Sequence, residues 1–199
     1  SNRILKPMLI CVVVFLLLGL GFQLRERNSV WSSTLTLWED AALNGGTWRA
    51  HLNYALALDD VGRSREALAE FERAVELGPY AFGYLNLGLA HVKRGNIDLG
   101  VSHLRRAVSL WPDSPETRLY LGYGLGQAGK PGEAEAEFRE ALRLRPNFMK
   151  AYRILADFYE RQGRWNDAIT ALQQLLALDP GQSKVRTRIQ RLQQGEVRG

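Results

Sequence analysis

Two residue types recur at one fixed period in this 199-residue chain, and the period constrains the fold more than any other feature. Glycine recurs at spacings of 33, 34 and 34 residues, and proline recurs at the same spacings: Gly62, Gly95, Gly129 and Gly163; Pro79, Pro112, Pro146 and Pro180. A period of about 20–50 residues is typical of repeat architectures. Because glycine can reverse the chain and proline cannot continue a helix, each period is expected to hold two helices joined by a turn.

Each period also carries the same pattern of small and large residues. Small residues precede the glycine (Ala55, Gly88, Gly122, Ala156) and large ones follow it (Phe71, Leu104, Phe138, Leu172). The first set would let two helices approach closely, and the second would fill the space between successive helix pairs. This pattern resembles the tetratricopeptide repeat, and the third unit matches it most fully, with Leu121, Gly122, Gly129, Ala134, Phe138, Ala141 and Pro146. The resemblance implies an all-α solenoid of four repeats, at about 48–80, 81–114, 115–148 and 149–181.

A further helix is expected on each side of the repeats, because a terminal repeat leaves one apolar face without a neighbour. Residues 28–47 include an amphipathic pattern over 29–43, which Asn44, Gly45 and Gly46 should end. Residues 182–199 carry an apolar stripe formed by Val185, Ile189 and Leu192. We interpret both segments as capping helices.

The first 27 residues include a run without charge over 7–24, PMLICVVVFLLLGLGFQL, with basic residues on both sides. Its length lies just inside the range of a bilayer-spanning helix, which needs about 20 residues. A cleaved signal peptide is the alternative, but no small-residue cleavage site follows the run. We therefore expect a retained apolar helix, either in a membrane or in the core of an assembly. The flanking charges do not set its orientation.

Composition and motifs favour a binding protein over an enzyme. The net charge of +5 arises in the second half, which holds 16 Lys and Arg against 11 Asp and Glu, but these residues alternate along the helices. We therefore expect a solvated surface and no nucleic-acid partner. The glycines at 124, 126 and 129 match a dinucleotide fingerprint without the strand that it requires. The lone cysteine, Cys11, excludes an intrachain disulfide, and no catalytic residue, cofactor, metal site or small-molecule substrate is predicted.

The family resemblance implies that the first helix of each repeat lines a concave face that contacts protein partners. The predicted contact residues are Leu52, Asn53, Leu56, Phe82, Leu85, Asn86, Leu89, Leu119, Tyr120, Tyr123, Lys150 and Arg153, with Asp157 beside them. The Lys/Arg/Asn clamp that some members use for a terminal carboxylate is absent. The first three repeats should instead present an apolar and aromatic strip, which usually marks a binding surface. Some of these leucines could alternatively belong to the core.

A second resemblance concerns the junction before the repeats, where Arg27, Trp31, Trp38, Arg49 and Asn53 stand as in polytopic bacterial membrane proteins with C-terminal repeats, several of them glycosyltransferase-like. With Ser1 as the first residue, it suggests a tail of a longer protein. Three functions remain open: a membrane-anchored scaffold that binds a partner peptide, a partner helix or copies of itself; a subunit of an extracellular filament; and the repeat module of a membrane glycosyltransferase. The repeats are expected outside the cytoplasm, or at the cell surface in a filament.

Overall fold

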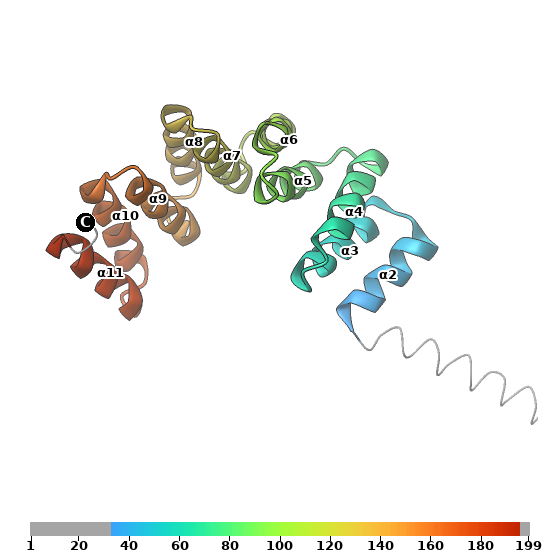
Figure 1. The fold of residues 1–199 in the computed structure, drawn as a ribbon, viewed down its shortest axis with the longest axis horizontal. Coiled ribbons are helices and arrows are strands. Elements are labelled where there is room, and N and C mark those ends of the chain that lie inside the picture. Colours follow the sequence, from blue (N-terminus) through green and yellow to red (C-terminus); the bar gives the residue numbers. More distant parts are fainter. Residues whose placement is uncertain (1–32, 196–199) are drawn as a thin grey trace, which may run out of the picture. The chain divides into compact units, whose positions relative to one another are not determined.

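The computed structural model describes residues 33–195, and these residues form ten helices and no strand (Figure 1). The all-α prediction is therefore confirmed for this part of the chain. The expected apolar helix over 7–24 lies outside the described residues. Among the helices that are described, none is long and apolar enough to cross a bilayer.

The chain divides into two compact units, with the boundary between Leu77 and Gly78. The first unit contains α2 (Thr34–Gly45), α3 (Trp48–Asp60) and α4 (Ser64–Leu77). The second contains α5 (Ala81–Lys93), α6 (Ile97–Leu110), α7 (Pro115–Gln127), α8 (Pro131–Leu144), α9 (Met149–Arg161), α10 (Trp165–Leu178) and α11 (Ser183–Gln194).

The helix ends follow from local sequence. The periodic glycines join the two helices of each pair, and all four have positive φ, as at Gly129 (70°) and Gly163 (69°). This left-handed conformation costs glycine no steric energy, which explains the period. Ser114 starts α7 by accepting a hydrogen bond from the Thr117 amide, and Pro115 occupies the first turn.

In the first unit, α3 and α4 form one helix pair and α2 packs against α3. Phe71 and Leu58 are buried between the helices, at 3% and 0% exposure. The Tyr54 hydroxyl donates to Glu39 of α2 at 3.1 Å. Helix α2 therefore covers the side of α3 where a preceding helix would lie.

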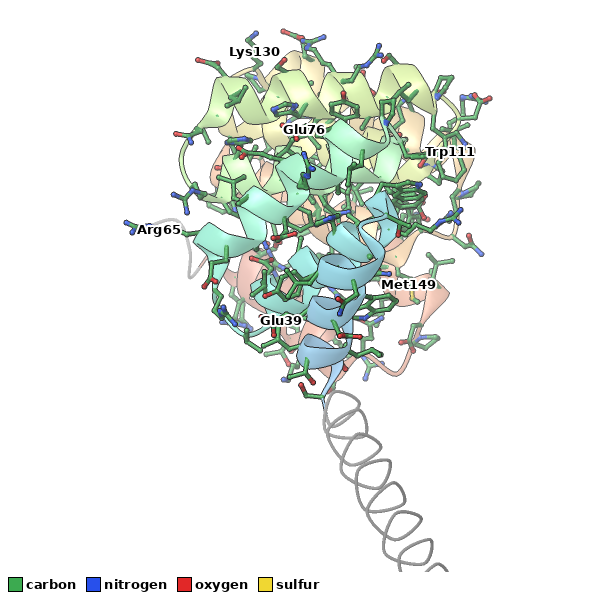
Figure 2. All side chains as sticks on the ribbon, turned by 90° about the vertical axis from the view of Figure 1, so that its right-hand side faces the viewer. Glu39, Arg65, Glu76, Trp111, Lys130 and Met149 are labelled. Carbon is green, nitrogen blue, oxygen red and sulfur yellow. The ribbon has the colours of Figure 1, made fainter. Side chains whose placement is uncertain are left out.

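The second unit contains three helix pairs, α5/α6, α7/α8 and α9/α10, and α11 packs on α10. The large residues after each turn are fully buried, as at Leu104, Phe138 and Leu172. Ion pairs join successive repeats, such as Arg105 of α6 to Glu133 of α8 (2.6 Å). Lys130 and Trp111 are among the exposed side chains of this unit (Figure 2).

Three glycines of α7, Gly122, Gly124 and Gly126, allow its neighbours to approach closely. A Cβ on Gly122 would lie 2.8 Å from the ring of Phe138, and one on Gly124 would lie 2.8 Å from Leu104. A Cβ on Gly126 would lie 3.2 Å from the ring of Phe158. These three glycines, of which Gly124 and Gly126 belong to the nucleotide-like fingerprint, therefore serve packing with three different helices.

The curvature of the second unit follows from which helices touch. The first helices of successive pairs pack against each other, α5 on α7 and α7 on α9. Among the described residues, no comparable packing joins α6 with α8 or α8 with α10. The first helices therefore lie closer together than the second ones, so α5, α7 and α9 form the inner face of this unit.

Candidate functional site

Three of the predicted contact residues belong to the core and correct the prediction. Leu52, Leu85 and Leu119 are only 9%, 4% and 0% exposed. Leu85 and Leu119 lie in the continuous core of the second unit, where α5 packs on α7. Their side chains point at neighbouring helices, so a partner cannot reach them.

The other predicted residues are accessible to different extents. Leu56 of the first unit is 39% exposed and Phe82 of the second is 45% exposed. Lys150 and Arg153 are exposed, and the half-buried members are Asn53, Asn86, Leu89, Tyr120 and Tyr123. The Asn86 side chain donates to the Phe82 carbonyl in its own helix, at 2.8 Å. We name the accessible residues of the second unit the inner strip: Phe82, Asn86, Leu89, Tyr120, Tyr123, Lys150 and Arg153.

A pocket of about 330 Å³ lies beside the inner strip, between α7 and α9. Its lining combines apolar and polar residues: Tyr123, Gly126, Phe138, Ile154 and Phe158; Gln127, Asp157, Arg161 and Gln162. Phe138 and Phe158 are buried and stack edge to face with centroids 5.2 Å apart, so they form its floor. The polar residues are half-buried or exposed and surround its mouth.

The inner strip ends in a row of charged residues on α9. Lys150, Arg153, Asp157 and Arg161 follow one another at intervals of three and four residues, so they lie on one side of the helix. The Lys150 ammonium contacts the Tyr120 hydroxyl and lies 4.9 Å from the centroid of its ring. Arg188 of α11 binds Asp157 at 2.5 Å.

A second charged cluster holds α9 against α8 and α10. Glu135 accepts hydrogen bonds from Arg164 at 2.7 Å and from the Tyr159 hydroxyl at 2.8 Å. The hydrogen bond from Arg164 is the main cause that lowers the pKa of Glu135. Burial, together with the hydrogen bond to Glu135, raises the pKa of Tyr159 to about 12. This cluster fixes the position of the helix that carries the charged row.

Sequence reasoning missed the pocket itself, which Gly126, Ile154, Phe158 and Arg161 help to line. Gly126 stood out only as a helical glycine within a nucleotide-like motif. The pocket combines α7 of one repeat with α9 of the next, so the pattern within a single repeat does not reveal it. Within the described part of the chain, no group of three or more His, Cys, Asp or Glu residues is arranged to hold a metal ion.

Curated relatives share this sequence pattern over much of the chain. Protein O-mannosyl-transferase TMTC1 of Homo sapiens is 29% identical over 137 residues, which is 65% of this chain and 16% of that protein. Cellulose synthase operon protein C of Xanthomonas axonopodis pv. citri (strain 306) is 28% identical over 177 residues, which is 87% of this chain and 10% of that protein. The chain thus spans less than a fifth of either relative.

Solved structures share the fold. TTC0263, a thermophilic TPR protein of Thermus thermophilus, has a TM-score of 0.72 and 25% identity, covering 88% of this chain and 96% of that chain. YrrB, described as a TPR protein with an unusual peptide-binding site, has a TM-score of 0.62 and 21% identity, covering 85% and 88%.

Family profiles match most of the described residues. The tetratricopeptide repeat profiles cover residues 48–73, 85–125 and 121–183. These matches include every helix from α5 to α10 at least in part. The chain belongs to the tetratricopeptide repeat family.

Proposed function

We propose that this chain is a non-catalytic scaffold that binds a protein segment along the inner face of its second unit. Repeats of this family typically mediate protein–protein interaction, and their fold is generally non-catalytic. The observation that carries the proposal is the pocket of about 330 Å³ between α7 and α9, which the half-buried ring of Tyr123 helps to line. A concave site with an apolar floor and a few polar groups at its mouth is typical of binding sites.

The shape of the inner face favours an extended or helical segment of a partner. The inner strip runs along three successive first helices, and its apolar members stand apart from one another on α5 and α7. A chain laid across these helices could bury one side chain after another, as peptides do in helical grooves. The similarity to YrrB, a TPR protein with an unusual peptide-binding site, supports the same kind of partner.

The proposal extends to a place at a membrane. The uncharged run over 7–24 would anchor the chain, with the repeats outside the cytoplasm. A second candidate function is the repeat module of a larger membrane glycosyltransferase. The similarity to TMTC1, whose name describes an O-mannosyl-transferase, favours it, because the matched region is a small part of that protein.

Photo-crosslinking from single positions tests the binding face. A photoreactive phenylalanine analogue replaces Tyr123 on the inner strip or, as the control, Leu99, which is 47% exposed on α6. In cells that make the full chain, we expect the analogue at position 123 to crosslink one protein. The analogue at position 99 should not crosslink that protein. Crosslinking of the same protein from Leu99 alone would refute the proposal. Leu85 is unsuitable for such a test because it is in the core.

A further inference from the structure

Gly126 lines the pocket beside the ring of Phe158. A Cβ there would lie 3.2 Å and 3.4 Å from two atoms of the Phe158 ring. A larger residue would therefore occupy the space above that ring. The volume of about 330 Å³ is at the small end of ligand sites, which span roughly 300–1,000 Å³. This space fits one bulky apolar side chain resting on Phe158 and Phe138.

Three cations beside the pocket form no ion pair with any described residue. Arg161 lines the pocket, and Lys150 and Arg153 lie on the same side of α9. The nearest polar partner of Arg153 is the Gln182 side chain, at 3.4 Å, and that of Lys150 is the Tyr120 hydroxyl. Neither partner is a carboxylate.

The carboxylates of α9 are already engaged. Arg188 binds both Asp157 at 2.5 Å and Glu160 at 2.8 Å, and the cations Lys150, Arg153, Arg161 and Arg188 together exceed these two acids by two positive charges. The excess extends beyond α9, because residues 78–195 contain 17 Lys and Arg against 11 Asp and Glu. Cations that lack partners attract and orient segments of opposite charge.

We infer that the bound segment is acidic and inserts one bulky apolar side chain, aromatic or large aliphatic, into the pocket. This inference rests on the proposed function. Carboxylates before and after this side chain would pair with Arg161 on one side and with Lys150 and Arg153 on the other. The apolar floor distinguishes a protein segment from a nucleic acid or a lipid surface, whose charge alone would satisfy the cations. Both features are needed. The pocket binds the apolar side chain of the segment, and the cations bind the carboxylates before and after it.

Synthetic peptides test the anchor and the charge separately. The probes are labelled Glu-Asp-Glu-Phe-Glu-Asp-Glu, the same peptide with Ala for Phe, and one with Lys for every acid, titrated into the full chain in detergent solution. We expect the Phe peptide to bind at least about tenfold more tightly than the Ala peptide, because an aromatic ring is buried. The Lys peptide should not bind. Equal affinity of the Phe and Ala peptides, or tighter binding of the Lys peptide, would overturn the inference.

Charge reversal on the protein provides the matched comparison. Arg161→Glu should weaken the Phe peptide about tenfold, whereas Arg106→Glu, the same change at an exposed residue of α6, should leave its affinity within about twofold. Circular dichroism verifies that both variants are folded. If Arg161→Glu is not folded, Arg161→Ala replaces it in the comparison. Equal losses in both variants would show that only overall charge matters and would overturn the inference.

Two further outcomes identify other occupants. A ten-nucleotide single-stranded DNA that competes with the Phe peptide and binds as tightly would overturn the assignment to a protein segment. Self-association that Arg161→Glu abolishes would assign the pocket to a neighbouring copy and overturn the assignment to a separate partner. If the peptides fail but Tyr123 still crosslinks a protein that Leu99 does not, the proposed function stands and only the acidic anchor is refuted.

Discussion

Replacing Phe138 with alanine tests whether the third and fourth repeats depend on one shared residue. Phe138 is 1% exposed, its ring packs against Gly122, and it stacks on Phe158 of the next repeat at 5.2 Å. The backbone of Gly122 cannot move into the space because α7 also packs against α5 and α9. Truncating a buried phenylalanine at such a site costs about 3–5 kcal/mol of unfolding free energy.

The loss should spread beyond α8, because the stability of a repeat depends on its interfaces with its neighbours. Urea unfolding, followed by far-ultraviolet circular dichroism, measures the total loss. Hydrogen exchange should show faster exchange in α9 and α10 as well as in α7 and α8. As a control, Gln173→Ala on the exposed side of α10 should change stability by less than about 0.5 kcal/mol. A loss below about 1 kcal/mol for Phe138→Ala would refute the assigned packing.

Further predictions concern the glycines and the charged cluster. Gly122→Ala should destabilise the chain by about 1–3 kcal/mol, because its Cβ would lie 2.8 Å from a buried ring, whereas Gly132→Ala, with nothing within 4 Å, should be neutral or stabilising in the same urea unfolding assay. Glu135→Gln should cost about 1–2 kcal/mol at neutral pH by weakening its bond to Arg164. Because the pKa of Glu135 is lowered from 4.5, its contribution is present above pH 4.5 and is lost as the pH falls through the lowered value; equal acid sensitivity in Glu135→Gln would contradict this. The pKa of Tyr159 is raised from 10.0 to about 12, so its contribution is present below pH 10 and is lost as the pH rises towards 12. The stability of Tyr159→Phe in the same assay should therefore change less than that of the wild type across that range, and an equal change would contradict this.

The fold was predictable because the same local sequence signals recur in every repeat. Each periodic glycine marks a turn with positive φ, and Phe138 and Leu104 are buried as their positions indicate. The helix start at Ser114 was also readable, since its cap and the following proline are local signals. All of these features depend on residues that are close in sequence.

The candidate site was less predictable because exposure depends on contacts between repeats. Leu85 and Leu89 lie one helical turn apart on α5, yet Leu85 is 4% exposed and Leu89 is half-buried. The difference arises from packing between successive first helices, which no pattern within one repeat encodes. The same holds for the cations of α9, because the capping helix supplies Arg188 to bind Asp157.

The most direct test of whether the inner face of the second unit binds a protein segment is hydroxyl-radical footprinting of the full chain. The footprint is recorded with and without the partner protein that crosslinking from position 123 identifies. The method reports the solvent access of single side chains on both faces of the unit at once. We predict that Tyr123 and Ile154 lose reactivity when the partner is bound, while Leu99 on α6 keeps it. Loss of reactivity at Leu99 with no change at Tyr123 and Ile154 would contradict the proposed binding face.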